Sequence, residues 1–248
     1  MRTILPIGLF TSLTFLSGCT GSPYAPTEKA ATGLHDGLVL VAPSKGTVIM
    51  RSPANKVALL KGPAYTERGT TIETPAAAAA SFSLFNGVAG TVRENSGFRF
   101  LTLLGEPEGY SNPFRIETGD GNYERGYSLV EMELQRGGVD LETGWLSARS
   151  VCLVRTAAGL VKYVAGTVEI RLSRNANGDQ VLTVTCPRGS AEVSYVNFTK
   201  DSAHTKAVVR GGYLQISQNQ AAGRTVVVTG EAPAVKIAPA APAVPVAK

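Results

Sequence analysis

Apolar and polar residues alternate along most of the chain, in short runs separated by breaks that contain glycine. Clear examples lie at 47–50, 98–101, 168–172 and 181–184. Alternation with a period of two, bounded by turn residues, is typical of half-buried β-strands. Asn177 and Gly178 lie between two such runs and form the dipeptide most typical of a tight hairpin turn. The pattern predicts an all-β domain over residues 38–230.

One stretch favours a different local structure. The five consecutive alanines at 76–80 have high helix propensity, but they lie between Pro75 and the alternating run at 82–85. Two interpretations remain open for this stretch. It forms a helical turn, or it forms a strand whose small side chains allow two backbones to approach closely.

The first residues have the pattern of an export signal. Arg2 is followed by an apolar run at 4–16 and by small residues before Cys19. The run is too short to span a membrane, which takes about 20 residues. Leu16-Ser17-Gly18-Cys19 resembles the lipobox of bacterial lipoproteins. An ordinary export signal with an incidental cysteine is the alternative.

The lipoprotein resemblance implies a signal peptide at 1–18 and a lipid attached to Cys19, which anchors the chain to a membrane of the bacterial cell envelope. Thr20 stands where enteric lipoproteins kept in the inner membrane carry Asp, which favours the outer membrane facing the periplasm. Residues 19–37 are polar and small and predict a flexible tether. Residues 231–248 contain four prolines and predict an extended tail, either a spacer or a frayed terminus.

Composition and motifs exclude several kinds of metal and catalytic site. The chain has only two histidines, His35 and His204, and three cysteines, which excludes a three-histidine metal site and a four-cysteine zinc site within it. The sequence contains no nucleophile elbow and no phosphate-binding loop. Glu131 and Glu133 alternate along a predicted strand and are interpreted as a solvated sheet face rather than an acid–base pair. We therefore expect no enzyme activity, no metal and no cofactor.

The net charge of +5 does not predict a nucleic-acid partner. The 24 Lys and Arg residues are scattered along the chain rather than clustered. Binding to a nucleic-acid backbone requires basic side chains gathered on one surface, and the expected envelope location also argues against it. We expect no nucleic acid among the partners.

Two segments of the chain resemble each other. The motif at 72–77 leads to 88–93, and the similar motif at 154–159 leads to 164–169. Such a repeat suggests two related β units that are stacked or paired. A chance recurrence in a chain rich in Gly, Thr and Val is the alternative.

The order of several short motifs resembles the FecR domain, the periplasmic module of iron-dicitrate sensor proteins. The matching segments are 59–62, 69–74, 82–87, 93–96, 134–139, 154–159, 164–167 and 188–193. The resemblance covers about residues 47–217 and implies a β domain of two related units, solenoid-like or a sandwich. Pro75 departs from the family pattern, and we expect no transmembrane helix and no sigma-factor-binding segment. The resemblance therefore implies an envelope signalling or transport role without direct control of a sigma factor.

Residues 105–128 form an insertion relative to that family pattern. Aromatic and arginine side chains are concentrated there, and these are the side chains that most often anchor protein interfaces. The predicted partner-binding loop consists of Tyr110, Phe114, Arg115, Tyr123, Arg125 and Tyr127. In the alternative interpretation, the aromatic rings pack back onto the sheet.

Two cysteines remain once Cys19 is acylated. Cys152 and Cys186 both lie in strand-like runs, and an exported protein meets an oxidising environment. A disulfide between them is one prediction. Two buried free thiols acting as small apolar residues are the alternative.

These inferences lead to one functional hypothesis and one alternative. The hypothesis is a non-enzymatic, lipid-anchored envelope protein whose FecR-like domain binds a protein partner in signalling or transport. The alternative is a structural module of the envelope that binds glycan or peptidoglycan.

Overall fold

The computed structural model describes residues 34–106, 126–143 and 146–232, and these residues form strands and turns with no helix. The predicted all-β fold is confirmed. The strands are β1 (His35–Asp36), β2 (Val39–Lys45), β3 (Val48–Arg51), β4 (Val57–Leu60), β5 (Ala64–Thr66), β6 (Thr71–Thr74), β7 (Ala79–Leu84), β8 (Ala89–Val92), β9 (Ser96–Gly105), β10 (Ser128–Thr143), β11 (Val151–Thr156), β12 (Gly159–Arg174), β13 (Gln180–Asn197), β14 (Ser202–Val209), β15 (Gly212–Asn219) and β16 (Arg224–Glu231). No described helix could cross a membrane.

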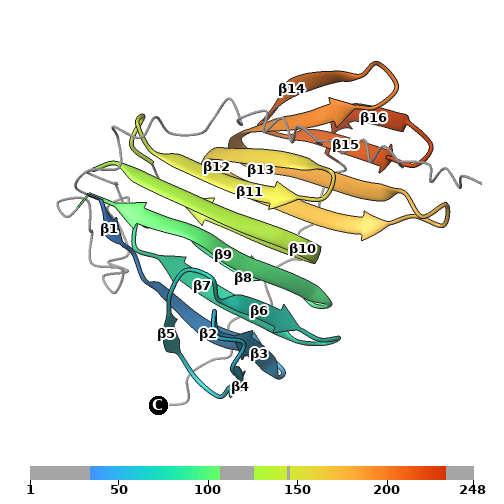
Figure 1. Ribbon diagram of the computed structural model, residues 1–248. Coiled ribbons are helices and arrows are strands. Elements are labelled where there is room, and N and C mark those ends of the chain that lie inside the picture. The colour runs from blue at the N-terminus through green and yellow to red at the C-terminus, as the bar shows by residue number, and fades with distance from the viewer. Residues whose placement is uncertain (1–33, 107–125, 144–145, 233–248) are drawn as a thin grey trace, which may run out of the picture. The chain divides into compact units, whose positions relative to one another are not determined.

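All sixteen strands belong to one hydrogen-bonded sheet, which folds over on itself into two layers (Figure 1). The first layer runs in the order β4-β3-β6-β9-β10-β11-β12-β13-β14. The second layer runs in the order β5-β2-β7-β8-β10-β12-β13-β15-β16. Three strands occur in both layers, because the long strands β10, β12 and β13 each begin in one layer and end in the other.

Pairing along β10 shows how a strand changes layer. Its first half pairs with β9 and, in parallel, with β11, whereas its second half pairs with β8 and β12. The change occurs at Gly137, which has a φ of 80°. A side chain at Gly137 would collide with Ser96, and L-residues rarely adopt this φ. Glycine therefore allows the strand to bend here while its pairing continues.

The core lies between the two layers. Phe82 of β7 in the second layer contacts Phe98 and Phe100 of β9 in the first, with ring centroids 5.5 Å apart in both cases. All three side chains are buried. Burial of one such side chain contributes about 1.5–3 kcal/mol to stability. This aromatic cluster holds the two layers together at the N-terminal side of the domain.

The alanine run is divided, and only its last two residues adopt the predicted strand form. Ala76 and Ala77 form a turn, and Ala79 and Ala80 begin strand β7. Ala80 is fully buried and pairs with Val92 of β8. Tertiary pairing on both sides of β7 outweighs the helix propensity of alanine, which amounts to less than about 1 kcal/mol per residue.

The predicted hairpin at Asn177 and Gly178 is present and connects β12 to β13. Gly178 has a φ of 79°, and its N–H donates to the carbonyl oxygen of Asn175 at 2.9 Å. The side chain of Asn175 accepts from the N–H groups of Asn177 and Asp179, each at 2.9 Å. The polar groups of the turn therefore form hydrogen bonds with one another, in the hairpin that the dipeptide predicted.

The two similar segments flank one strand. Residues 89–92 form β8 and residues 164–169 lie in β12, and both pair antiparallel with the second half of β10, on opposite sides of it. The insertion connects two neighbouring strands, because Gly105 at the end of β9 lies opposite Ser128 at the start of β10. Strand β1 lies within the range expected to be tether and pairs with β9.

Candidate functional site: a polar hollow on the second layer

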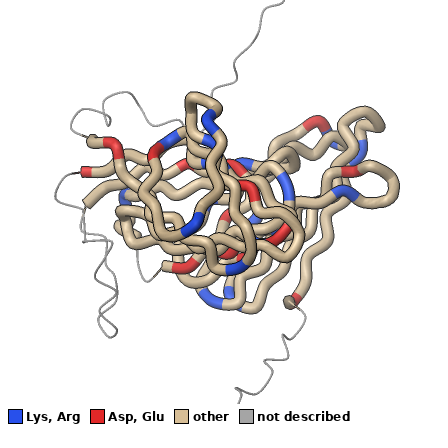
Figure 2. The backbone as a smooth tube through the Cα atoms, turned by 90° about the horizontal axis from the view of Figure 1, so that it is seen from below, with Lys and Arg blue, Asp and Glu red and all other residues tan. Residues whose placement is uncertain are grey.

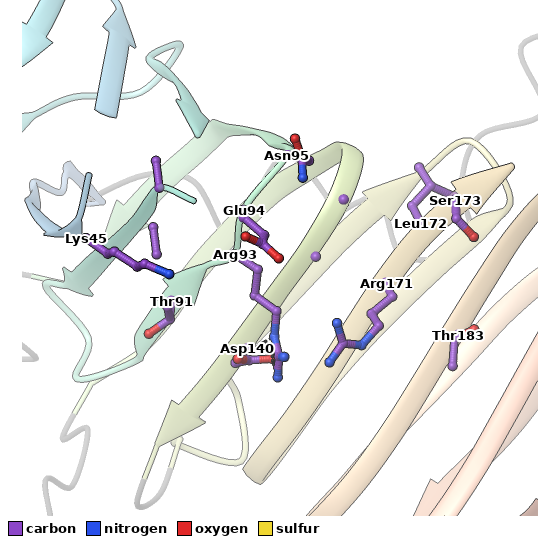
Figure 3. Close-up of a pocket in the computed structure, with 14 residues that line it drawn as sticks. Lys45, Thr91, Arg93, Glu94, Asn95, Asp140, Arg171, Leu172, Ser173 and Thr183 are labelled. Carbon is purple, nitrogen blue, oxygen red and sulfur yellow. Dashed lines mark hydrogen bonds and ion pairs between the residues drawn. The ribbon is translucent and has the colours of Figure 1, made fainter. Parts of the chain in front are cut away.

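The described surface has a hollow of about 710 Å³ on the outer face of the second layer (Figure 3). Strands β8, β10, β12 and β13 form its floor, and the β6–β7 and β8–β9 turns form part of its rim. Its lining residues are Lys45, Ala78, Ala79, Thr91, Arg93, Glu94, Asn95, Gly137, Gly138, Asp140, Arg171, Leu172, Ser173 and Thr183. Most of these side chains are polar or very small.

Strand register explains why the charged side chains meet here. Thr91 of β8 lies opposite Asp140 of β10, and Asp140 lies opposite Glu169 of β12. Directly opposed residues point to the same face of a sheet. The next row, which includes Val139 and Ile170, points inward and is fully buried. A row of polar residues on the outer face is therefore fixed by the packing of the row beneath it.

Four side chains from β10, β12 and the β8–β9 turn form a chain of alternating charge. The Arg93 Nε lies 2.8 Å from both carboxylate oxygens of Asp140, and its Nη2 lies 3.3 Å from Glu169. Glu169 also contacts Arg171 at 3.4 Å. A single exposed ion pair contributes at most about 1 kcal/mol, but a connected network also fixes the position of each side chain. Figure 3 shows Arg93, Asp140 and Arg171 side by side on the floor of the hollow.

Burial raises the pKa of Asp140, and the nearby Glu169 carboxylate adds to the increase, while hydrogen bonds and charge from Arg93 oppose it. Arg93 thus offsets only part of the effect that burial has on the pKa of Asp140. Removing Arg93 would leave the Asp140 carboxylate without its main partner in a half-buried place.

Lys45 and Glu94 lie at the rim of the hollow. The Glu94 carboxylate accepts the Ala77 N–H at 3.2 Å, which fixes it to the β6–β7 turn. Lys45 extends toward the hollow in Figure 3 and makes no ion pair with another described residue. The hollow therefore offers a free ammonium group beside a set of internally paired charges.

Small side chains surround the charged group on the same face. Opposite Glu169 lies Thr185, and opposite Arg171 lies Thr183. Ser81 of β7 lies opposite Thr91. Small residues on a sheet surface allow another molecule to come close to the backbone. The arrangement suits binding of a polar surface, and among the described residues no group of acidic, histidine and cysteine side chains could hold a metal ion.

Sequence reasoning missed this site. Arg93, Asp140 and Glu169 are far apart in the chain, and no local motif connects them. The one available signal is the alternation of Glu169 and Arg171 about Ile170, which places two opposite charges on one face of a strand. Their partners depend on how β8, β10 and β12 align.

Only the base of the predicted binding loop is described. Tyr110, Phe114, Arg115, Tyr123 and Arg125 lie outside the described residues. The Tyr127 N–H donates to the Glu106 carboxylate at 2.9 Å, and the Glu106 N–H donates to the Tyr127 carbonyl oxygen at 2.9 Å. Arg149 contacts Glu106 at 3.3 Å and lies 5.8 Å from the centre of the Tyr127 ring. Burial raises the pKa of Tyr127. The two ends of the insertion are thereby held together.

Cys152 and Cys186 are both buried in the core, and the disulfide between them stays a prediction. Tyr163 lies opposite Cys152, and its hydroxyl donates to the Gly166 carbonyl oxygen at 2.7 Å. Burial raises the pKa of Cys186 to about 11. Cys19 lies outside the described residues.

The remaining polar residues singled out from the sequence make local contacts. Glu131 forms an ion pair with Arg155 at 2.8 Å and accepts the Thr102 hydroxyl at 3.1 Å. His204 lies 2.9 Å from the Ser202 hydroxyl and stacks on the Tyr195 ring. His35 is exposed in β1. Figure 2 shows basic and acidic residues interspersed along the described backbone rather than separated by sign.

Comparisons with known proteins identify no family. No family model and no curated protein matches the chain. Two solved structures resemble the fold, and both are crystal structures of a candidate anti-sigma factor from Parabacteroides distasonis. Each has a TM-score of 0.41 and covers 65% of this chain, and the identities are 15% and 17%. This chain spans 60% of the length of those proteins. A likeness of this extent supports no functional inference, and membership of the FecR family stays a prediction.

Proposed function

We propose that this protein is a non-enzymatic, lipid-anchored envelope protein whose β domain binds a protein partner in envelope signalling or transport. The export signal and Cys19 support the location and the anchor. The order of FecR-like motifs supports the signalling or transport setting. Binding itself is inferred from the polar hollow of the second layer.

The observation that carries the proposal is the ion network on the floor of the hollow. Because Arg93 and Arg171 are held by Asp140 and Glu169, their positions are set before any partner arrives. Interactions made by groups that are already in place lose little conformational entropy on binding. Charges of both signs at fixed positions favour a partner with a complementary charge pattern, and they contribute more to specificity than to affinity.

Lys45 gives the hollow a preference for a partner that presents a carboxylate. It is the cation of the lining that makes no ion pair with another described residue, so an incoming carboxylate can pair with it without breaking an existing contact. The partner is then a protein that presents an acidic side chain beside a polar, closely fitting surface. Small residues such as Thr91 and Thr183 leave room for that surface.

A crosslinking experiment in intact envelopes tests the proposal. A photoreactive amino acid is placed at Thr183, at the edge of the hollow, and as a control at Lys206 on β14. We expect a discrete crosslinked protein from position 183 only. The substitution Lys45→Glu should abolish it, whereas Lys206→Glu should not.

Two results would contradict the proposal. One is equal crosslinking from positions 183 and 206, which indicates contact without a defined site. The other is the absence of any crosslinked protein together with binding to isolated peptidoglycan that Lys45→Glu abolishes. That second result would assign the hollow to the glycan-binding alternative.

A further inference from the structure

Each layer of the described domain ends in a strand with one unpaired side, and these outer strands differ in how they are protected. In the first layer they are β4, of four residues, and β14, which carries His204 and Lys206. In the second layer they are β5, of three residues, and β16, of eight residues. Short length and charged residues are the usual ways in which proteins keep edge strands from pairing. Strand β16 has neither, because it carries no charge between Arg224 and Glu231.

Hydrogen bonds at one end of β16 reveal which backbone groups face outward. The Thr225 N–H donates to the Thr199 hydroxyl at 3.0 Å, and Thr199 belongs to the β13–β14 turn rather than to β15. The Ala232 N–H, by contrast, donates to the Gly211 carbonyl oxygen next to β15. Backbone groups alternate in direction along a strand. The N–H and C=O groups of Val227, Thr229 and Glu231 therefore face the open edge.

The side chains near this edge are apolar. Val226 and Val228 are 48% and 49% exposed on the outer face, opposite Ser217 and Gln215 of β15. Val227 points inward and packs against the core. Nothing in the described chain covers the open edge beyond Thr225. A long edge strand of this kind is a template for pairing with another strand.

We infer that β16 pairs with β16 of a second copy of this chain, in antiparallel orientation, so that the second layers of two molecules form one continuous sheet. Thr199 occupies the edge at Thr225, which leaves three open positions at Val227, Thr229 and Glu231. A two-fold axis maps these three positions onto one another only when Thr229 lies opposite Thr229 of the second copy. Val227 then lies opposite Glu231 of the second copy, and all three open positions exchange hydrogen bonds.

Charge favours a second copy in this orientation. The strand begins with Arg224, which also pairs with Asp179 at 2.7 Å, and ends with Glu231, which makes no ion pair within the described chain. Antiparallel pairing brings the basic end of each strand toward the acidic end of the other, and it makes the interface isologous, which is the commonest arrangement of dimers. This inference does not depend on what binds the hollow of the second layer.

The dimer should be weak and dependent on concentration. One strand edge buries much less than the roughly 1,600 Å² of a standard stable interface. We therefore expect a dissociation constant on the order of micromolar, corresponding to about −8 kcal/mol.

Sedimentation velocity of the whole mature chain, with Cys19→Ser to keep it in water, tests the inference across a concentration series. We expect a shift from monomer to dimer. The substitution Thr229→Pro should abolish the dimer, because it removes an N–H that faces the open edge and leaves the pairing with β15 intact. The matched control Val209→Lys, on the β14 edge, should leave the dimer unchanged. Unchanged circular dichroism and Tm would show that Thr229→Pro is folded.

A crosslink tests the register independently. Hydrogen-bonded residues directly opposite each other have Cα atoms about 5.5 Å apart, which fits a disulfide. Under mild oxidation, Thr229→Cys should give a covalent dimer, whereas Val57→Cys on β4 should not; the native Cys152 and Cys186 are buried. A monomer at every concentration, or a dimer that persists in folded Thr229→Pro, would overturn the inference.

Discussion

Gly166 of β12 lies directly opposite Gly189 of β13, at the point where both strands pass from one layer to the other. Their φ angles are 87° and 80°, which L-residues rarely adopt. A side chain at Gly166 would lie 2.5 Å from the Arg188 carbonyl oxygen, and one at Gly189 would overlap the Ala165 carbonyl oxygen. Two strands can bend together here because neither carries a side chain.

The substitution Gly189→Ala should destabilise the domain strongly. The left-handed backbone costs about 1–2 kcal/mol for a residue with a Cβ, and the collision with Ala165 adds to this because the obstacle is backbone. Gly211→Ala is the matched control, since Gly211 has a φ of 72° but open space around it. In urea unfolding, Gly189→Ala should lower the free energy of unfolding by at least about 1 kcal/mol more than Gly211→Ala does. Equal losses of stability in the two variants would mean that the point where β12 and β13 change layer tolerates a side chain.

Asp179 should make stability depend on acid pH. Its carboxylate accepts hydrogen bonds from Asn175 at 3.0 Å, Asn219 at 2.8 Å and Arg224 at 2.7 Å, and so connects the β12–β13 and β15–β16 hairpins. These hydrogen bonds, from Asn175 first, lower its pKa below 3.8. Its contribution is therefore present above pH 3.8 and is lost as the pH falls through the lowered folded-state pKa.

Thermal unfolding of Asp179→Asn at several pH values checks this expectation. The Tm difference from the natural protein should be largest near neutral pH and shrink below 3.8, the unshifted pKa of the group. The exposed Asp36, replaced by Asn, serves as the control and should have little effect at any pH. A difference for Asp179→Asn that is constant with pH would contradict the assignment.

Arg93→Met should destabilise the domain by about 1–3 kcal/mol at neutral pH, the cost of a half-buried polar group that loses its partner. It leaves the Asp140 carboxylate without its main compensation while Glu169 remains nearby. Since the pKa of Asp140 is already raised and would rise further, the loss should diminish in acid as Asp140 takes up a proton.

A double-mutant cycle with Asp140→Asn isolates the pair. The combination Arg93→Met with Asp140→Asn should be less damaging than the sum of the single substitutions, as measured by urea unfolding. Simple additivity would show that the two side chains do not depend on each other.

Cys152 and Cys186 should be unreactive in the folded protein. Both are buried, and burial raises the pKa of Cys186 to about 11, so little thiolate is present at neutral pH. Mass spectrometry after alkylation should find no modification of either cysteine in the native domain, and two after unfolding without reductant. A mass lower by two hydrogens, with the peptides of the two cysteines joined, would instead establish the disulfide.

Replacement of Cys19 should remove the membrane anchor. In Cys19→Ala the thiol that is predicted to receive the lipid is absent, so the chain should remain unprocessed or be found outside the membrane fraction. Fractionation of cells with detection of the protein measures this. Normal processing and normal membrane recovery of the variant would contradict the lipoprotein assignment.

The FecR-like motifs and the structure agree on the β architecture, but they point to different candidate binding surfaces. The motifs predicted two related units, and the corresponding strands β8 and β12 lie on opposite sides of β10. The insertion that the sequence singled out as a binding loop has a firmly held base at Glu106 and Tyr127. The polar hollow lies elsewhere, on a face that no motif marks.

The sequence by itself determined what depends on neighbouring residues. Alternation of apolar and polar residues predicts strands, because side chains alternate between the two faces of a strand. The Asn177-Gly178 turn was likewise predictable, since its backbone shape depends only on a few adjacent residues. The predicted export signal also rests on a local pattern.

Tertiary structure alone decided which strands meet and where they change layer. The period-two pattern tells which side of a strand Asp140 occupies, but its pairing with Thr91 and Glu169 depends on the register of three strands that are distant in the chain. The same holds for the alanines of β7, whose strand form requires partners on both sides, and for the open edge of β16. Register between distant strands is set by how the whole core packs, because a shift of one residue would turn every buried side chain of a strand toward solvent.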